Sequence, residues 1–472
     1  MRSSQGLTVP IELDRAARRP LQDQLAEQLA GAVDRGLLDR GCRLPSTRTL
    51  AEQLRVSRGV ALAAYELLYV RGYLEGRQGS GSYVAARRAR PAAAGPPAAP
   101  TRPDRVDCTP GQATRERFPL AAWRAAWRHA SFRPPPVSAL PRGGLPELRR
   151  AVAGHLRRTR GLACDEHEVL ITAGVPHGLR LVLDALGGGR VAVQDPAPPV
   201  LRQVVADSGH RPVALPVDRD GGWTGAVPPS CAAVLVSPDG QQPFGAVVSA
   251  LRRQQLADWA RREDGLLVEV ACDHVAPAAA PLPRLLHLAG PCAALVGDFR
   301  GVFAPSLRVG YVLAHRDLLG DLGRCARQDD EQPSHVAQSA MAHLLDEGRV
   351  VRRLHQLGRL FERKDALVRA ALAPLGPAVR LAPPGAAGTV VAHLPDRLDA
   401  GAAHAELRRR GVLVPTLASF HLPGRPAGNG LVLGHGHLPD RVLRTVLDEL
   451  VDVLAAEDLT ADDLTTDRAI AL

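Results

Sequence analysis

The sequence predicts an α/β protein with two folded parts: a small basic helical part at the N-terminus and a larger part built on a mostly parallel sheet. Three observations support this. Two helical segments joined by a tight turn precede residue 72, a proline-rich stretch lies near residue 90, and strand-like runs alternate with helix-length segments from residue 169 onwards. With 472 residues, the chain should hold two or three domains.

The charge of the chain indicates a polyanionic partner. The formal net charge is +10, and residues 1–90 contain 15 arginines against 9 acidic residues, so most of the excess lies in the first fifth. A basic N-terminal part of this kind is typical of nucleic-acid binding. The seven cysteines are far apart and no apolar run is long enough to span a membrane, which predicts a cytoplasmic protein with reduced thiols.

The helical pattern near the N-terminus predicts a helix-turn-helix with a wing. A first amphipathic helix begins at Pro20, because leucines recur every fourth residue after it. Ser46 and Ser57 are good N-caps for two further helices, 47–54 and 58–72, separated by a tight turn. The short strands YLEG and SYVA, joined by RQGSG, would form the wing.

In a winged helix, the second helix of the motif enters the major groove and the wing reaches the DNA backbone or minor groove. Helix N-termini and arginines suit phosphate contacts. The candidate DNA-binding residues are therefore Arg48, Ser57, Arg58, Gly59, Arg77, Gln78, Gly79 and Gly81. The alternative is a solvated basic helical domain, which the order of helices, wing and linker disfavours.

Composition divides the chain into four segments. The predicted winged helix spans residues 10–86, and the stretch 87–107, rich in proline, alanine and arginine, is a semi-extended linker because it cannot build a core. Residues 108–456 form the large domain, and the polar, acidic residues 457–472 are expected to fray. Within the large domain, VLITAG, RVAVQDP, AAVLVSP and GLLVEVAC predict buried parallel strands, and TVVAHLP and GLVLGHG belong to a smaller C-terminal α+β lobe.

The N-terminal segment resembles the GntR-type winged helix through LPSTRTLAEQL, VSR, AYELL, GYLE and GSGSYVA. The resemblance implies that Arg48, Arg58 and the wing hold double-stranded DNA. Relatives often carry Asn and Thr after the VSR arginine, where this chain has Gly59 and Val60. Either the recognised sequence differs from theirs, or Arg58 and Val60 read it by contacting guanine and a thymine methyl group.

The whole chain is similar to the MocR-like regulators, whose second part looks like a fold type I aminotransferase. The similarity includes FPLAAWRAAW, LPELRRAVAGHLRRTRG, SPDGQQPFG and GDFRGVFAPSLRVGY, which is close to a family pattern GTFSKTLAPSLRLGY. The resemblance implies a homodimer whose large domain senses a small-molecule effector. It also implies pyridoxal 5'-phosphate as the cofactor of the family.

Pyridoxal phosphate chemistry needs an amine for an imine, a carboxylate for the pyridine nitrogen and groups that hold the ring. By the resemblance, the imine lysine falls at Gly301. The carboxylate, ring-hydroxyl tyrosine, stacking aromatic and phosphate hydroxyl fall at Val270, Cys272, Pro198 and Val175. The one lysine of the chain, Lys364, is expected on a solvated helix face. The sequence therefore predicts a degenerate site without covalent cofactor.

Two further groups of residues carry weaker signals. Arg308 matches a family arginine that contacts the cofactor phosphate, and Arg300 stands where a phosphate-binding serine is expected, so both could form a residual anion site. The alternative is that acidic neighbours or helix ends satisfy both arginines. His435 and His437 lie two residues apart on an expected strand, but the sequence places no third ligand and predicts no metal site.

The leading hypothesis is that the protein is a DNA-binding transcription regulator and not an enzyme. Its aminotransferase-like domain would dimerise and sense a small ligand, which can be anionic. Two alternatives stay open. One is an enzyme, or a regulator, that uses pyridoxal phosphate without a lysine. The other is a DNA-compacting protein that uses its positive charge without sequence preference.

Overall fold

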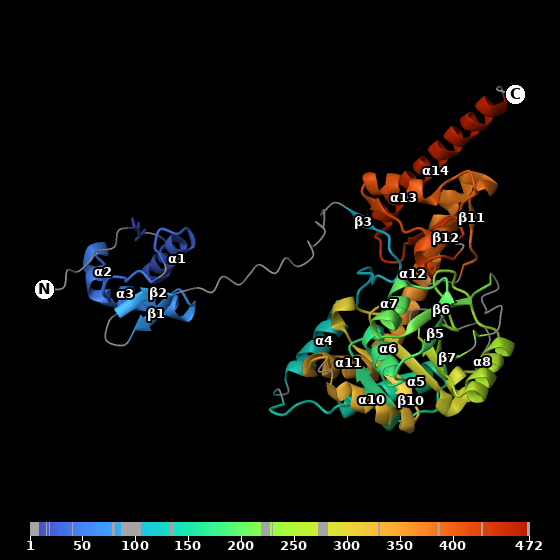
Figure 1. Ribbon diagram of the computed structural model, residues 1–472, viewed down its shortest axis with the longest axis horizontal. Helices are drawn as coiled ribbons and strands as arrows, with labels where there is room; N and C mark the ends of the chain where they lie inside the picture. The colour runs from blue at the N-terminus through green and yellow to red at the C-terminus, as the bar shows by residue number, and fades with distance from the viewer. Residues whose placement is uncertain are drawn as a thin grey trace. The chain divides into compact units, whose positions relative to one another are not determined.

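The computed structural model describes residues 9–15, 17, 19–39, 41–77, 81–85, 105–132, 134, 136–218, 227–228, 230–271, 282–328, 331–384, 388–425 and 428–469. The chain divides into two compact units, Met1–Thr101 and Arg102–Leu472 (Figure 1). Gln78, Gly79, Cys272 and most of the expected linker lie outside the described residues.

The N-terminal unit is a three-helix core with a two-stranded wing, as predicted. Its elements are α1 Leu21–Asp34, α2 Thr47–Leu54, α3 Arg58–Val70, β1 Leu74–Arg77 and β2 Gly81–Val84. Ser46 Oγ accepts a hydrogen bond from the Thr49 amide at 3.1 Å, and Ser57 Oγ accepts one from the Val60 amide at 3.3 Å. Both predicted caps therefore begin the helices of the motif.

Helix α3 is held against α1 and α2 by its apolar face. Ala61, Ala64, Tyr65 and Leu68 of α3 are buried in one cluster with residues of α1 and α2. The Tyr65 hydroxyl donates a hydrogen bond to the Pro45 carbonyl at 2.8 Å, so this buried polar group is satisfied. The opposite face of α3 is left exposed.

The large unit contains a seven-stranded sheet in the order β4-β10-β9-β8-β7-β5-β6. Its strands are β4 Val169–Thr172, β5 Arg190–Asp195, β6 Arg211–Pro216, β7 Cys231–Val236, β8 Leu266–Val270, β9 Ala293–Asp298 and β10 Gly310–Ala314. Only β10 runs against its neighbours, so the sheet is mostly parallel. Strand β6 was not predicted from the sequence, because it is an edge strand that carries two prolines and little buried surface.

Helices cover both faces of this sheet because successive strand residues point to opposite sides. On β9, Ala294 and Val296 pack with one group of helices, whereas Ala293 and Leu295 pack on the other face. The first group is α6 Val175–Asp184, α7 Pro199–Asp207 and α10 Arg316–Gln328. The other face is covered by α4 Leu120–Ser131, α5 Pro146–Arg160, α8 Ala250–Glu263, α9 Leu285–Ala289 and α11 His335–Asp346.

A smaller C-terminal lobe completes the unit. Strands β11 Arg380–Leu381, β12 Thr389–His393 and β14 Gly430–Gly434 form an antiparallel sheet, and β13 Val412–Leu413 pairs in parallel with β3 Val106–Asp107. The helices are α12 Arg349–Leu372, α13 Ala400–Arg409 and α14 Asp440–Ala469. Helix α14 continues where a frayed tail was expected, because neither glycine nor proline follows Pro439 to end it.

The expectation for Lys364 was wrong. Its side chain is fully buried on α12 and not solvated. Its ammonium group donates to the carbonyls of Gly436 and Leu438 at 3.1 and 2.5 Å and pairs with the Glu116 carboxylate at 2.5 Å. Lys364 therefore joins α12 to the turn after β14 and to the segment before α4.

We expect Lys364→Met to lower the free energy of unfolding of the large unit by about 3 kcal/mol, since it leaves Glu116 and two carbonyls without their cation. Urea unfolding followed by tryptophan fluorescence measures this, because all four tryptophans lie after residue 102. The matched control is Arg363→Ala on the same helix, whose exposed pair with Asp440 should contribute no more than about 1 kcal/mol. Equal losses in the two variants would contradict the structural role of Lys364.

Candidate functional site

The exposed face of α3 begins at the cap and follows one side of the helix. Ser57, Arg58 and Gly59 are exposed at its N-terminus. This agrees with the expectation that these three residues face the DNA groove. Leu62, one turn after Arg58, is 48% exposed, whereas Val60 is half-buried. Leu62 therefore projects from this surface close to Arg58, and it was not among the residues expected from the sequence.

Two other elements border this face. Arg48 projects from α2 with 82% of its side chain exposed and lies 3.2 Å from Glu52. In the wing, β1 and β2 pair antiparallel, and the backbone of Arg77 stands opposite Gly81 at the tip. Gly81 has a φ of +114°, which favours glycine there. The Tyr69 hydroxyl and Ser82 Oγ lie 2.6 Å apart and join α3 to the wing.

In the large unit, a cleft opens at the carboxyl ends of β4 and β9, beside the start of α6. This edge is where open parallel sheets bind ligands. The cleft has a volume of about 340 Å³. Three arginines and three carboxylates are among its described lining residues: Arg180, Arg300, Arg308, Asp207, Asp298 and Glu331.

Both arginines of the predicted anion site line this cleft, each beside a carboxylate. Arg300 Nη2 lies 2.9 Å from Asp298 Oδ2, and Arg308 Nη2 lies 3.8 Å from Glu331 Oε2. The second pair is loose, because 65% of the Arg308 side chain is exposed. Burial lowers the pKa of His177, which also lines the cleft, to about 4, so its ring is neutral at pH 7.

A second concavity, of about 540 Å³, adjoins this cleft and shares Ala173, Arg308 and Glu331 with it. One wall is aromatic: Trp123 and Trp127 of α4 have ring centroids 5.4 Å apart. Arg308 therefore stands between the two openings, within reach of a ligand in either.

The comparisons with known proteins agree with this architecture. The model of the bacterial regulatory proteins of the gntR family matches residues 21–84. The chain is 33% identical over 461 residues to the HTH-type pyridoxine biosynthesis transcriptional regulator PdxR of Corynebacterium glutamicum, covering 95% of this chain and 99% of that one. It is 28% identical to the probable rhizopine catabolism regulatory protein MocR of Rhizobium meliloti, covering 97% and 98% of the two chains.

The chain belongs to the MocR-like, GntR-type transcriptional regulators. It is therefore a DNA-binding regulator and not an enzyme. Solved structures show the fold of the large unit: an archaeal alanine:glyoxylate aminotransferase has a TM-score of 0.67 at 20% identity, covering 75% of this chain and 91% of that one. LysN, an α-aminoadipate aminotransferase from Thermus thermophilus, has a TM-score of 0.66 at 22% identity, covering 76% and 94%.

The aminotransferase fold implies pyridoxal phosphate in this family, so the matched positions test whether it fits here. Gly301 offers no amine and borders a cavity of about 20 Å³. Val270 is buried in an apolar cluster with Val175, and Pro198 borders a cavity of about 10 Å³. Small-molecule pockets usually exceed about 300 Å³. The described residues at these positions supply no imine, no carboxylate and no stacking ring, and Cys272 lies outside the described range.

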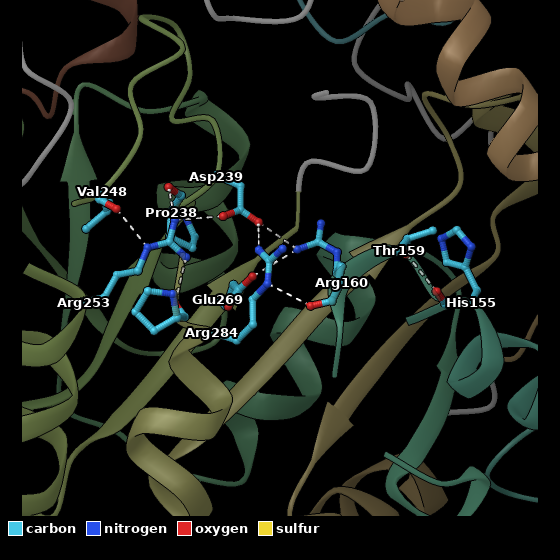
Figure 2. Close-up of polar contacts among 10 residues, drawn as sticks. His155, Thr159, Arg160, Pro238, Asp239, Val248, Arg253, Glu269 and Arg284 are labelled. Carbon is cyan, nitrogen blue, oxygen red and sulfur yellow. Dashed lines mark hydrogen bonds and ion pairs between the residues drawn. The ribbon is translucent and has the colours of Figure 1, made fainter. Parts of the chain in front are cut away.

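A carboxylate does stand next to Val270, but it faces the other way. Glu269 precedes Val270 on β8, and neighbouring strand residues point to opposite faces. Glu269 is buried and accepts a hydrogen bond from Arg160 at 3.1 Å (Figure 2). Burial raises the pKa of Glu269, partly offset by Arg160. It therefore cannot replace the carboxylate that the family places at Val270.

Asp239 is the centre of the same buried cluster. Figure 2 shows Arg160, Arg253 and Arg284 around its two oxygens. The nitrogen–oxygen distances are 3.2, 2.8 and 2.7 Å, respectively. Burial alone would raise the pKa of Asp239, but the hydrogen bond from Arg253 and the charges of the three arginines hold it below its ordinary value. The cluster joins α5, α8 and the segment before α9, and no local sequence pattern predicted it.

Within the part of the chain that the structure describes, no group of three or more His, Cys, Asp or Glu is arranged to hold a metal ion. β14 ends at Gly434, so His435 and His437 follow the strand and do not lie on it, contrary to expectation. His437 Nε2 lies 2.7 Å from the Asp107 carbonyl. In the same described ranges, no helix is long and apolar enough to cross a membrane.

We expect Asp239→Asn to lower the free energy of unfolding by about 3 kcal/mol at pH 7, because three guanidinium groups then share one carboxylate. The folded pKa of Asp239 lies below its unfolded value, so its stabilisation is present above about pH 4 and is lost as the pH falls further. Urea unfolding at pH 7 and pH 3.5 should show that the difference in free energy of unfolding between wild type and variant is smaller at pH 3.5. Asp258→Asn, which removes an exposed ion pair on α8, is the control. If the Asp239→Asn variant differs from the wild type by the same free energy at both pH values, the stabilising role of the Asp239 carboxylate is contradicted.

Proposed function

We propose that this regulator binds its promoter through α3 and the wing. Ser57, Arg58 and Gly59 enter the major groove, and Arg48 contacts a phosphate. The wing, through Arg77 and Gly81, reaches the DNA backbone; Gln78 and Gly79, expected to contact DNA from the sequence, lie outside the described residues. The observation that carries the proposal is that the gntR family match covers the same residues that fold into the helix-turn-helix and wing.

Leu62 joins this set in our proposal. It projects one helical turn after Arg58 on the same exposed face, where a groove-bound helix would carry it to a base edge. An exposed leucine has no hydrogen bond to offer, so its natural partner in the major groove is the methyl group of thymine. The half-buried Val60 is less able to make the thymine contact expected from the sequence.

Arg48→Ala should weaken binding to the operator and reduce the slope of log K against log salt by about 1, because one phosphate-neutralising charge is lost. Operator sites are first selected from a random DNA pool with the full chain, and affinities are then measured by fluorescence anisotropy at several salt concentrations. Arg71→Ala, at the far end of α3, is the control and should leave affinity unchanged. Equal losses in both variants would indicate non-specific electrostatic binding.

In the same assay, Leu62→Ala distinguishes the contribution of a thymine-methyl contact to DNA affinity from the contribution of charge. It should lower affinity without changing the salt slope, because leucine carries no charge. Replacing a contacted thymine by deoxyuridine removes only the methyl group and should weaken wild-type binding about fourfold. The Leu62→Ala variant should no longer distinguish the two bases; a preserved distinction would exclude Leu62 as the contact.

We further propose that the large unit is a cytoplasmic dimerisation and effector module. A small ligand enters the 340 Å³ cleft, where Arg308 is the cation most free to bind an anionic group, because it is exposed and 3.8 Å from Glu331. Arg300 is held by Asp298 at 2.9 Å. The ligand regulates DNA binding only by preferring one arrangement of the two winged helices over another.

The module works without covalent pyridoxal phosphate in this proposal. Gly301 supplies no amine, and the Lys364 ammonium is buried and already contacts the Gly436 and Leu438 carbonyls and the Glu116 carboxylate, so it is not available to a cofactor. After addition of pyridoxal phosphate and borohydride, intact-mass measurement should therefore show no stoichiometric adduct, and no imine absorption band should appear. An active aminotransferase treated in parallel is the positive control.

A stoichiometric adduct, wherever its site, would overturn the claim that the cofactor is not bound covalently. Noncovalent binding would instead appear as protection against heating without the absorption band. If Arg308 holds the phosphate, Arg308→Ala should remove that protection. Arg308 lies in the large unit, so urea unfolding of this unit, compared with the wild type, is the control for folding.

A further inference from the structure

The carboxylate of Asp298 lies at the first turn of α6, although Asp298 is 123 residues away from Val175 along the chain. Asp298 Oδ2 accepts a hydrogen bond from the Val175 amide at 3.0 Å, and Oδ1 accepts one from the Arg300 amide at 3.2 Å. The Arg300 guanidinium lies 2.9 Å from Oδ2. Only 11% of the Asp298 side chain is exposed, whereas 39% of the Arg300 side chain is exposed, so the carboxylate is the more shielded partner of this pair.

The first turn of helix α6 has backbone amides that require a hydrogen-bond acceptor from outside the helix. No side chain at its own N-cap accepts a hydrogen bond, because the cap is Gly174, and Pro176 in the first turn has no amide hydrogen. A helix N-terminus of ten residues carries a partial positive charge that attracts anions. The Asp298 carboxylate, delivered from the end of β9, supplies that negative charge from within the protein.

We infer that Asp298 is an internal anion that occupies the position where a phosphate group would bind, so that this cleft excludes phosphorylated ligands and accepts only ligands without phosphate. The inference rests on the proposed use of the cleft as the ligand site. A phosphate beside Val175 would lie within hydrogen-bond distance of the Asp298 oxygens, and two anions at that distance repel strongly.

The charge balance of the cleft supports the same conclusion. Asp298 uses both the Val175 amide and the Arg300 guanidinium, which are two of the donors that a phosphate at this place would require. Arg308 is a further cation that lines the cleft, and one loosely paired guanidinium balances the single charge of a carboxylate but not both charges of a phosphate dianion. The excluded class therefore includes free phosphate and pyridoxal phosphate alike.

The test removes the internal anion and asks whether an external one enters. Asp298→Ser and the isosteric Asp298→Asn are prepared in the full chain, and binding of inorganic phosphate is measured by calorimetry and thermal shift. We expect no binding to the wild type and at least about tenfold tighter binding to the variants, because the like-charge repulsion is gone. Adding Arg300→Ala to Asp298→Asn should abolish the gained site.

Pyridoxal phosphate and pyridoxal provide a second pair of probes, since they differ only in the phosphate group. Asp298→Ser should gain affinity for the first and not for the second. Wild-type binding of phosphate as tight as in the variants, or no gain in either variant, would overturn the inference. Asp298→Asn keeps an oxygen for the Val175 amide and covers the case in which the serine variant fails to fold.

These measurements need neither DNA nor the effector, so their failure is distinguishable from failure of the proposed function. Loss of the Arg308-dependent ligand site would leave the phosphate comparison intact. Failure of the phosphate comparison alone would leave promoter binding and effector sensing as proposed.

Discussion

The alternation of side chains along the parallel strands of the large unit decides which residues can reach the cleft. Glu269 and Val270 are neighbours on β8, yet one belongs to a buried arginine cluster and the other to the apolar core beside α6. The Glu269 carboxylate cannot replace a carboxylate at position 270, because neighbouring residues of a strand point to opposite faces of the sheet. The pleat of the sheet thus prevents Glu269 from taking the place of a carboxylate at Val270.

Charge compensation within the protein is the second consistent feature. Asp239 gathers three arginines, Glu116 holds the buried Lys364, and Asp298 pairs with Arg300. Buried charges are tolerated when each has a partner and further hydrogen bonds, whereas loss of one partner is costly. In a chain with a single lysine, arginine supplies nearly all these contacts, and its planar fork can serve several acceptors at once.

Local signals predicted the fold well and the site only in part. Ser46 and Ser57 were predictable because an N-cap depends on residues within one turn, and the apolar runs of β4, β5, β7 and β8 are typical of buried strands. The edge strand β6 was missed because its prolines and low burial weaken the pattern. Lys364 was misplaced because its partners are 72 and 74 residues away along the chain. The Asp298 contact with Val175 spans 123 residues, so only the folded sheet brings the two together.

A site that satisfies its own charges differs physically from one that waits for a cofactor. In a cofactor site, the helix amides and cations are left without partners until the phosphate arrives, so the ligand-free protein is less stable by the cost of those unmade contacts. Here Asp298 already accepts a hydrogen bond from the Val175 amide at the start of α6 and pairs with Arg300, so these donors have a partner within the protein. A regulator must populate its ligand-free form in order to report the arrival of an effector. In the proposed sensor, this internal pairing disfavours a phosphorylated cofactor, and a ligand need exchange only the loose Arg308 and Glu331 pair to bind.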